Sequence, residues 1–286
     1  MTGTDAARRA GERRGAGHLA TYAVLTVLAI AYIFPFLIQV LNSFKTDVEA
    51  TNAGMALWSA NWTTAAYTTL FQNSDFPLWT LNSFVVTVLV TLGRVFFVSL
   101  AGYALARLRF PGRQVVYVML LGVMSVPAVV LLIPKFLVIK SLGIYDSYPG
   151  MVLPLLVDAA GVFIMRNFFE SIPVAVEEAA RIDGAGTFRT FWSVVLPMSR
   201  PALMTIIILS FQGSWNELTH FIVSTQSPHL TTLTKGVASL ASGQLSQGNQ
   251  YPIKLAAAAL MTIPVAVVFF VFQRRIMNAS GGAVKE

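Results

Sequence analysis

Long stretches without charged residues are the feature of this sequence that most limits how it folds. Residues 19–41 contain no charged side chain, and about 20 apolar helical residues are enough to cross the hydrocarbon core of a bilayer. Five further runs are predominantly apolar: 84–105, 115–133, 148–165, 202–223 and 255–272. The sequence therefore predicts an all-α integral membrane protein with six transmembrane helices.

The composition agrees with a membrane protein. Of the 286 residues, 55% are hydrophobic and only 12% are charged, whereas about a quarter of the residues of a soluble domain are charged. The mean hydropathy is +0.66. These values exclude an ordinary soluble domain. The sequence contains no cysteine, which excludes disulfides, thiolate metal sites and a cysteine nucleophile within it.

The basic residues indicate how the chain is oriented, because short cytoplasmic loops of membrane proteins are enriched in Lys and Arg. Most of the 20 basic residues lie before the first run, after the second, after the fourth and after the sixth, whereas the opposite loops hold Lys45, Lys135, Lys140, Lys235 and Lys254. This distribution predicts that both termini are cytoplasmic. It also accounts for the net charge of +7 without a nucleic-acid partner, because the charges are spread over separate segments.

The predicted spans divide the chain into five parts. They are a cytoplasmic tail at 1–18, a first transmembrane helix at 19–43, an external loop at 44–80, a transmembrane core at 81–277 and a cytoplasmic C-terminal tail at 278–286. The core includes spans two to six and a polar cytoplasmic loop at 170–200. We interpret the first apolar run as a retained anchor, since it is too long for a secretory signal and has no small-residue cleavage site.

Aromatic side chains are frequent in the first external loop, which contains Trp58, Trp62, Tyr67, Phe71 and Trp79. Trp and Tyr are common where a membrane meets water, so they are interpreted either as interfacial anchors and packing residues or as contacts for an external partner. A second external loop at 225–253 is rich in Ser, Thr, Gln and Gly and is interpreted either as a re-entrant or as a partner-facing segment.

The cytoplasmic loop at 170–200 has clear helix-boundary signals. Ser171 is suited to an N-cap and Pro173 to a first helical turn. Gly184 is suited to a helix C-terminus, where the left-handed conformation is favourable only without a Cβ. Thr187 is expected to cap a second helix, which Pro197 is expected to end. The sequence thus predicts two short helices joined by a turn, lying beneath the membrane.

The first of these helices resembles a docking surface. Ala179 and Ala180 would leave one of its faces without bulk, so that the backbone of a partner can approach closely. Glu178 and Asp183 would supply acceptors for cations or helix N-termini across the contact. A solvated surface helix is the alternative interpretation, and the wider pattern decides between the two.

That pattern is Glu-Ala-Ala, three residues, Gly, nine residues, an aliphatic residue, any residue and Leu-Pro; it occupies Glu178, Ala179, Ala180, Gly184, Val194, Leu196 and Pro197. It resembles the signature loop of the permease subunits of binding-protein-dependent ATP-binding-cassette importers, with Val194 in place of the commoner Ile. Residues 42–45, 101–113 and 141–146 are similar to segments of the maltose-type carbohydrate importers. The C-terminal tail resembles that of the smaller, six-span member of the permease pair.

The resemblance implies the partners and the energy source. Such permeases pair with a second permease subunit, bind an ATP-binding-cassette ATPase dimer that holds ATP and Mg, and receive a sugar from an extracytoplasmic solute-binding protein. This chain has no phosphate-binding loop of its own, so it is predicted to be a transport subunit and not an enzyme. The loop around Glu178 to Gly184 is expected to dock on the ATPase. Gly281, Gly282 and Lys285 are weaker contact candidates, with a disordered end as the alternative.

Polar residues within the spans are candidates for the translocation pathway, because a charge in hydrocarbon must find water, a partner or a cavity. Arg94 and Asp158 lie near the middle of spans two and four and are expected either to pair as a structural tie or to contact the solute. Gln212, Trp215, Asn216 and Glu217 in span five suit either sugar binding or bonding between helices.

Two other classes of protein were weighed. An ion-coupled secondary transporter has buried carboxylates, which Asp158 and Glu217 would supply, but it often shows repeated halves and would leave the docking loop unexplained. A membrane enzyme needs clustered catalytic groups, and none cluster here; the three histidines are too scattered for a metal site. The resulting prediction is a multi-pass cell-membrane permease subunit that imports a sugar, an oligosaccharide or a related polyol conjugate.

Overall fold

The computed structural model describes residues 4–72, 74–241 and 250–281. Every regular element within these residues is helical, as the sequence predicted. The chain forms two compact units, one of Met1–Ser74 with Gly243–Leu260 and one of Asp75–Ser242 with Met261–Glu286. Each unit is described by itself.

The first unit contains α1 (Thr4–Ser43), α2 (Asp47–Asn52), α3 (Ala65–Gln72) and the first turns of α15 (Tyr251–Gly281). Side chains of α1 from residue 21 to residue 37 are exposed, although nearly all of them are apolar. A helix that is apolar all round is stable in lipid or against other apolar helices. The exposed apolar surface of α1 is therefore suited to a membrane.

The segment at 42–45 fastens the polar loop that follows α1. The amide of Asn42 donates to the carbonyl of Gly54 at 2.6 Å. The Lys45 ammonium is 1% exposed and donates to the carbonyls of Ala53 at 3.1 Å and Ala56 at 2.6 Å. A buried cation needs such acceptors. This segment thus has a structural role, which is to close the loop between α2 and α3.

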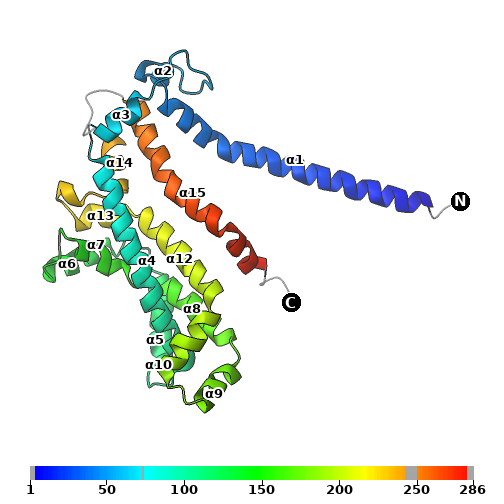
Figure 1. Cartoon of the computed structure of the whole chain (residues 1–286), viewed down its shortest axis with the longest axis vertical. Coiled ribbons are helices and arrows are strands. Elements are labelled where there is room, and N and C mark those ends of the chain that lie inside the picture. Colours follow the sequence, from blue (N-terminus) through cyan, green and yellow to red (C-terminus); the bar gives the residue numbers. More distant parts are fainter. Residues whose placement is uncertain (1–3, 73, 242–249, 282–286) are drawn as a thin grey trace. The chain divides into compact units, whose positions relative to one another are not determined.

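The second unit is organised around α4 (Phe76–Arg107), along which α8 (Ala159–Ser171) and α12 (Arg200–Trp215) pack (Figure 1). Gly102 permits the close approach of α4 and α8, since a Cβ added there would lie 2.8 Å from the Cβ of Met165. The core beside this crossing consists of Val98, Tyr103, Met165, Phe169 and Phe191 with their neighbours.

Shorter elements complete the second unit. They are α5 (Arg113–Met124), α6 (Leu132–Ser141), α7 (Tyr148–Val152), the 3₁₀ turn η1 (Leu153–Leu155), α9 (Val174–Ile182), α10 (Thr187–Thr190), the π-helical segment η2 (Phe191–Val195), α11 (Leu196–Met198), α13 (Thr219–Ser224), the 3₁₀ turn η3 (Pro228–Leu230) and α14 (Leu233–Ala241).

Helices long and apolar enough to cross a membrane number three within the described residues: Thr21–Ser43, Phe76–Arg107 and Tyr251–Gln273. Two bent pairs raise the number to five, Tyr148–Leu155 with Ala159–Ser171 at 44° and Thr187–Met198 with Arg200–Trp215 at 80°. The third predicted run, 115–133, is divided between α5 and turns that include Pro127, which has no amide hydrogen to continue a helix. Six uninterrupted helices are therefore not what the structure contains.

Trp79 also differs from its predicted role as a residue of the external loop. It belongs to the first turns of α4 and is buried. Its indole packs directly against Gly236 of α14, where a Cβ would overlap the ring. Trp79 is thus a core residue, whereas Trp58 is 80% exposed.

Candidate functional site

The helix that begins the signature pattern is α9, and its C-terminus has the predicted geometry. Gly184 has a φ of 80°, so the left-handed conformation expected of this glycine is confirmed. The amide of Ala185 donates to the carbonyl of Ala180 at 2.9 Å, which closes the last turn. The chain leaves α9 in a fixed direction as a result.

The predicted caps of the two helices are wrong. Ser171 is the last residue of α8, and its hydroxyl donates to the carbonyl of Phe168 at 2.7 Å, while Pro173 occupies the N-cap position of α9. Thr187 is the first residue of α10, with Gly186 before it. A proline at the first boundary has no amide hydrogen that would need a partner, and α9 has no side-chain cap bond at this end.

Pro197 does not end the second helix, contrary to the prediction. The helical run continues from α10 through η2 to α11 and stops at Ser199. A proline ring clashes with the carbonyl four residues earlier in an α-helix and removes one hydrogen bond. The wider π turn at Phe191–Val195, directly before Pro197, lets the chain accept the proline without stopping.

The segment formed by α9, α10 and η2 exposes acidic and apolar groups. Glu178, Ala179, Asp183 and Gly184 are exposed, as is Pro197, and Leu196 is half-buried. Beside them Ile182 and Phe188 are 86% and 70% exposed, and the rings of Phe188 and Trp192 stack with centroids 6.3 Å apart. We call Glu178, Ile182, Asp183, Phe188 and Trp192 the docking face.

Ala180 is buried, so only Ala179 contributes the open, small surface expected of both alanines. The stacked pair of Phe188 and Trp192 was not predicted from the sequence. Its signal was the spacing of Phe188 and Trp192, which lie four residues apart and so share one side of a helix.

Behind the docking face, α9 is fastened to α4 by a buried carboxylate. Glu177 is 2% exposed, and its Oε1 lies 2.9 Å from Nε of Arg107. Its Oε2 accepts a hydrogen bond from the Tyr103 hydroxyl at 3.2 Å. The sequence did not predict these partners of Glu177, because nothing local indicates contacts with a distant helix.

A second group of predicted residues lies around the break between η1 and α8 and near the end of α12. Nε of Arg94 donates to the carbonyl of Leu155, at the end of η1. Asp158 occupies the N-cap of α8 and accepts from the amide of Gly161 at 3.2 Å. Nη1 of Arg94 faces Gly213, where an added Cβ would lie 3.6 Å away. The structure thus brings Arg94 to the break before α8 and beside α12, but it shows no ion pair between Arg94 and Asp158 in the described part of the chain.

The remaining pathway candidates divide between packing and exposure. Trp215 is 2% exposed, and its indole nitrogen donates to the carbonyl of Met261 at 3.0 Å, so it ties α12 to α15. Gln212 and Asn216 are exposed, and the Asn216 amide donates to the carbonyl of Gln212 at 3.0 Å. Glu217 is half-buried and accepts from the amide of His220 at 2.8 Å.

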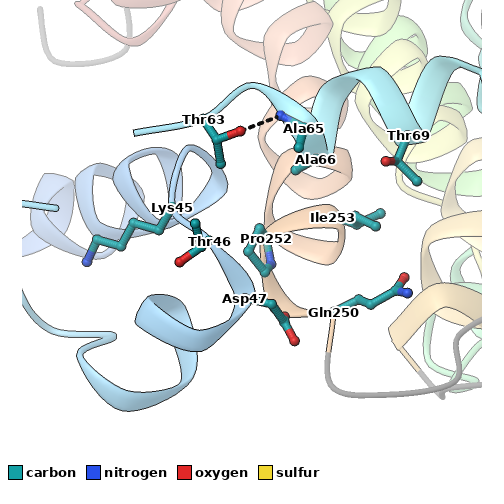
Figure 2. A pocket seen from close by; sticks show the side chains of 10 residues that line it. All are labelled: Lys45, Thr46, Asp47, Thr63, Ala65, Ala66, Thr69, Gln250, Pro252 and Ile253. Carbon is teal, nitrogen blue, oxygen red and sulfur yellow. Dashed lines mark hydrogen bonds between the residues drawn. The ribbon is translucent and has the colours of Figure 1, made fainter. Parts of the chain in front are cut away.

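The first unit contains a cavity of about 350 Å³ (Figure 2), lined by Lys45, Thr46, Asp47, Thr63, Ala65, Ala66, Thr69, Gln250, Pro252 and Ile253. Several polar groups around the cavity form hydrogen bonds at the ends of helices. Thr63 accepts from the amide of Ala65 at 3.1 Å and Asp47 from the amide of Tyr251 at 2.9 Å, while the Lys45 ammonium is bound to loop carbonyls. The cavity therefore lies where helix ends meet. Its charged groups are bonded to backbone groups, so they do not converge on a position where they would select a ligand.

The C-terminal contact candidates fall at the limit of the described residues. Gly281 is the last residue of α15, and Gly282 and Lys285 lie outside the described residues. No group of three or more His, Cys, Asp or Glu residues positioned to hold a metal occurs within the part of the chain that the structure describes.

These features define the class as an all-helical membrane protein whose exposed helix α9 is held to its core by a buried ion pair. The sequence profile of the family described as "Binding-protein-dependent transport system inner membrane component" matches residues 98–279, and this range includes α9, α10 and the break beside Arg94. The chain belongs to this family, and it is thus an inner-membrane permease component.

Similar proteins support this assignment. The chain is 31% identical to the diacetylchitobiose uptake system permease protein NgcG of Streptomyces coelicolor, over 91% of this chain and 86% of that one. It is 32% identical to the arabinooligosaccharides transport system permease protein AraQ of Bacillus subtilis, over 91% and 92%. A chain of a bacterial ABC transporter involved in the import of the acidic polysaccharide alginate has a similar structure, with a TM-score of 0.80, 25% identity and coverage of 90% and 95%.

Proposed function

We propose that this chain is a permease subunit of an ATP-driven importer for a sugar or oligosaccharide that an extracytoplasmic binding protein delivers. ATP and Mg are held by a separate ATPase dimer, and a second permease subunit completes the pathway. The family match over 98–279 supports this function most strongly. The names of the relatives support the carbohydrate class, because they include diacetylchitobiose and arabinooligosaccharide permeases.

The docking face is the proposed contact with the ATPase. It offers two carboxylates, Glu178 and Asp183, beside the exposed side chains of Ile182, Phe188 and Trp192. Aromatic side chains are enriched at the centres of protein interfaces, and polar groups form the rims around them. The fixed turn at Gly184 orients the two halves of the face. The C-terminal tail, with Gly281, Gly282 and Lys285, is a second proposed contact.

The translocation pathway is proposed to pass the breaks at Leu155–Asp158 and Asn216–Leu218. Arg94, Asp158, Gln212, Asn216 and Glu217 lie at or near these breaks. In transporters, interrupted membrane helices offer backbone groups and helix ends to a solute near the middle of the bilayer. Trp215 is proposed to hold the pathway in shape through its bond to α15 and not to touch the solute.

The test is copurification with uptake. The tagged chain, isolated in mild detergent, is expected to bring an ATPase and a second permease with it. Glu178→Lys and Gly184→Asp are expected to stay in the membrane, to recover less than a tenth of the ATPase, and to abolish uptake of labelled diacetylchitobiose or arabinooligosaccharides, whichever probe the unaltered complex takes up. Arg94→Met, in the same panel, is expected to lower uptake while the ATPase remains bound.

Ser141→Lys is the control, since it introduces a lysine at an exposed position at the end of α6 and is expected to retain both partner binding and uptake. A chain that purifies alone and moves solute under an ion gradient would contradict the proposed function. Full ATPase recovery and full uptake with Glu178→Lys would contradict the proposed role of the docking face but not the proposed importer function.

A further inference from the structure

The buried side of α9 offers a second functional feature, distinct from the docking face. Glu177 and Ala180 are the residues of α9 that are buried, whereas Glu178 is exposed. Successive residues of a helix are rotated by about 100°. The two adjacent glutamates therefore project in different directions, one outward and one toward the end of α4.

The Glu177 carboxylate is held on two sides by α4. Arg107, the last residue of α4, approaches Oε1 at 2.9 Å, and Tyr103, one turn earlier, donates to Oε2 at 3.2 Å. Arg181 of α9 lies 3.8 Å from Oε2 and is itself exposed. A carboxylate removed from water requires such a shell of partners, because an unpaired charge would be strongly disfavoured there.

The same guanidinium also holds the end of α8. Nη2 of Arg107 donates to the carbonyl of Phe169 at 2.6 Å and to that of Ile172. These carbonyls belong to the last turn of α8 and the residue after it, where helix carbonyls lack intrahelical partners and a positive charge is favoured. Arg107 thus joins the ends of α4 and α8 and the first turns of α9 at a single planar group.

A link made of an ion pair and hydrogen bonds differs from apolar packing in the movements that it transmits between helices. Apolar contacts resist separation but allow neighbouring helices to slide. The Arg107 guanidinium donates to two carbonyls and forms an ion pair with Glu177 at 2.9 Å, so it limits how far the ends of these helices can separate or slide. The docking helix is consequently held to the helix around which the second unit packs.

We propose that Arg107 and Glu177 are positioning residues that make α9 and α4 move as one body when the ATPase displaces the docking face. This inference rests on the proposed function of the docking face. Glu178 receives the force from the partner, and Glu177 passes it to the membrane helices. Tyr103 supports the link through its single hydrogen bond.

The test measures the distance between two spin labels in the complex assembled with the ATPase and second permease. The sequence contains no cysteine, so Ala175→Cys on α9 and Phe97→Cys on α4, both exposed, are the sole attachment points in this chain, and the partner subunits are used in cysteine-free form. With Glu177 present, the distance is expected to be narrow and unchanged within about 2 Å between the nucleotide-free and ATP-bound states, because the labels move together. With Glu177→Gln, the distribution is expected to broaden and to shift on ATP binding, although the ATPase is still recovered.

Glu170→Gln is the matched control. It removes a carboxylate at the end of α8 that pairs with Arg113 and Arg166 but does not touch α9, and it is expected to behave as the unaltered chain. If the Glu177→Gln chain does not insert into the membrane, Tyr103→Phe replaces it as the test variant. This substitution removes only the hydroxyl from the link and is expected to give the same broadening in weaker form.

The outcomes separate the two proposals. Failure of the unaltered chain to recover an ATPase would refute the proposed function. A recovered ATPase with a distance that is the same in Glu177→Gln, Tyr103→Phe and the unaltered chain would refute the link. A distance that already changes on ATP binding in the unaltered chain would refute it as well.

Discussion

At the scale of single residues, polar groups outside the spans hold loops in place by accepting several hydrogen bonds at once. Asp146 is the clearest case. Its Oδ1 accepts from the amides of Gln226 at 2.8 Å and Ser227 at 2.9 Å, and its Oδ2 from the Ser227 hydroxyl. These bonds, with that of the Ser227 hydroxyl first, lower the pKa of Asp146 to about 2 from its ordinary value of 3.8. The carboxylate thereby joins the α6–α7 loop to the segment after α13.

Asp146→Asn tests this joint through its pH dependence. A carboxylate whose pKa is lowered by folding stabilises the folded state above its unfolded pKa, and this contribution disappears as the pH falls through the folded pKa. We expect the melting temperature of the unaltered chain in detergent to lose this contribution between about pH 4 and pH 2. Asp146→Asn should lack this component and should melt lower at neutral pH.

Asparagine is the suitable substitute because Asp146 has a φ of 55°, a left-handed conformation that Asn adopts readily. The comparison then reports the charge and the acceptor rather than backbone strain. Equal melting temperatures at neutral pH and equal pH profiles for the two chains would contradict the assigned role.

At the scale of elements, the sequence indicated where helices occur better than how they are interrupted. Helix content, the apolar runs and the left-handed Gly184 follow from local chemistry, so they were predictable. The π turn before Pro197 and the turns around Pro127 were not, because a proline ends, bends or is accommodated by a helix according to what packs beside it. The link between Arg107 and Glu177 was missed for a similar reason, since its partners meet only after α4, α8 and α9 have packed.

The crossing of α4 and α8 gives a prediction at this scale. A Cβ at Gly102 would lie 2.8 Å from the Cβ of Met165 and 3.0 Å from the amide nitrogen of Arg166. Neither atom is the end of a flexible side chain, so Gly102→Ala must move the helices apart. We expect a loss of about 1–3 kcal/mol of stability, measured by unfolding in mixed micelles.

Gly122→Ala is the matched control for this substitution. Gly122 lies within α5, and a Cβ there would meet nothing within 4 Å. Alanine favours a helix over glycine by about 0.5–1 kcal/mol, so Gly122→Ala should be neutral or slightly stabilising. Equal effects of the two substitutions would show that α4 and α8 do not depend on close contact at Gly102.

At the scale of the whole molecule, the open question is how often the chain crosses the membrane. The basic residues favour six crossings with both termini cytoplasmic, whereas the described helices offer three to five spans by length and composition. The difference lies mainly in residues 115–133, where α5 is followed by turns and then by α6. If this broken segment crosses, Arg109 and Ser141 lie on opposite sides; if it turns back, they lie on the same side.

Single cysteines resolve this question, because the sequence has none of its own. Trp58→Cys, Arg109→Cys and Ser141→Cys place thiols at exposed positions. Six crossings predict that a membrane-impermeant maleimide labels positions 58 and 141 in cells whose inner membrane is intact, and labels position 109 only after that membrane is permeabilised. Labelling of both 109 and 141 only after permeabilisation would show that 115–133 re-enters instead of crossing. With one crossing fewer, the basic loop at 170–200 would lie outside, against the basic-residue distribution, unless residues 148–171 also turn back.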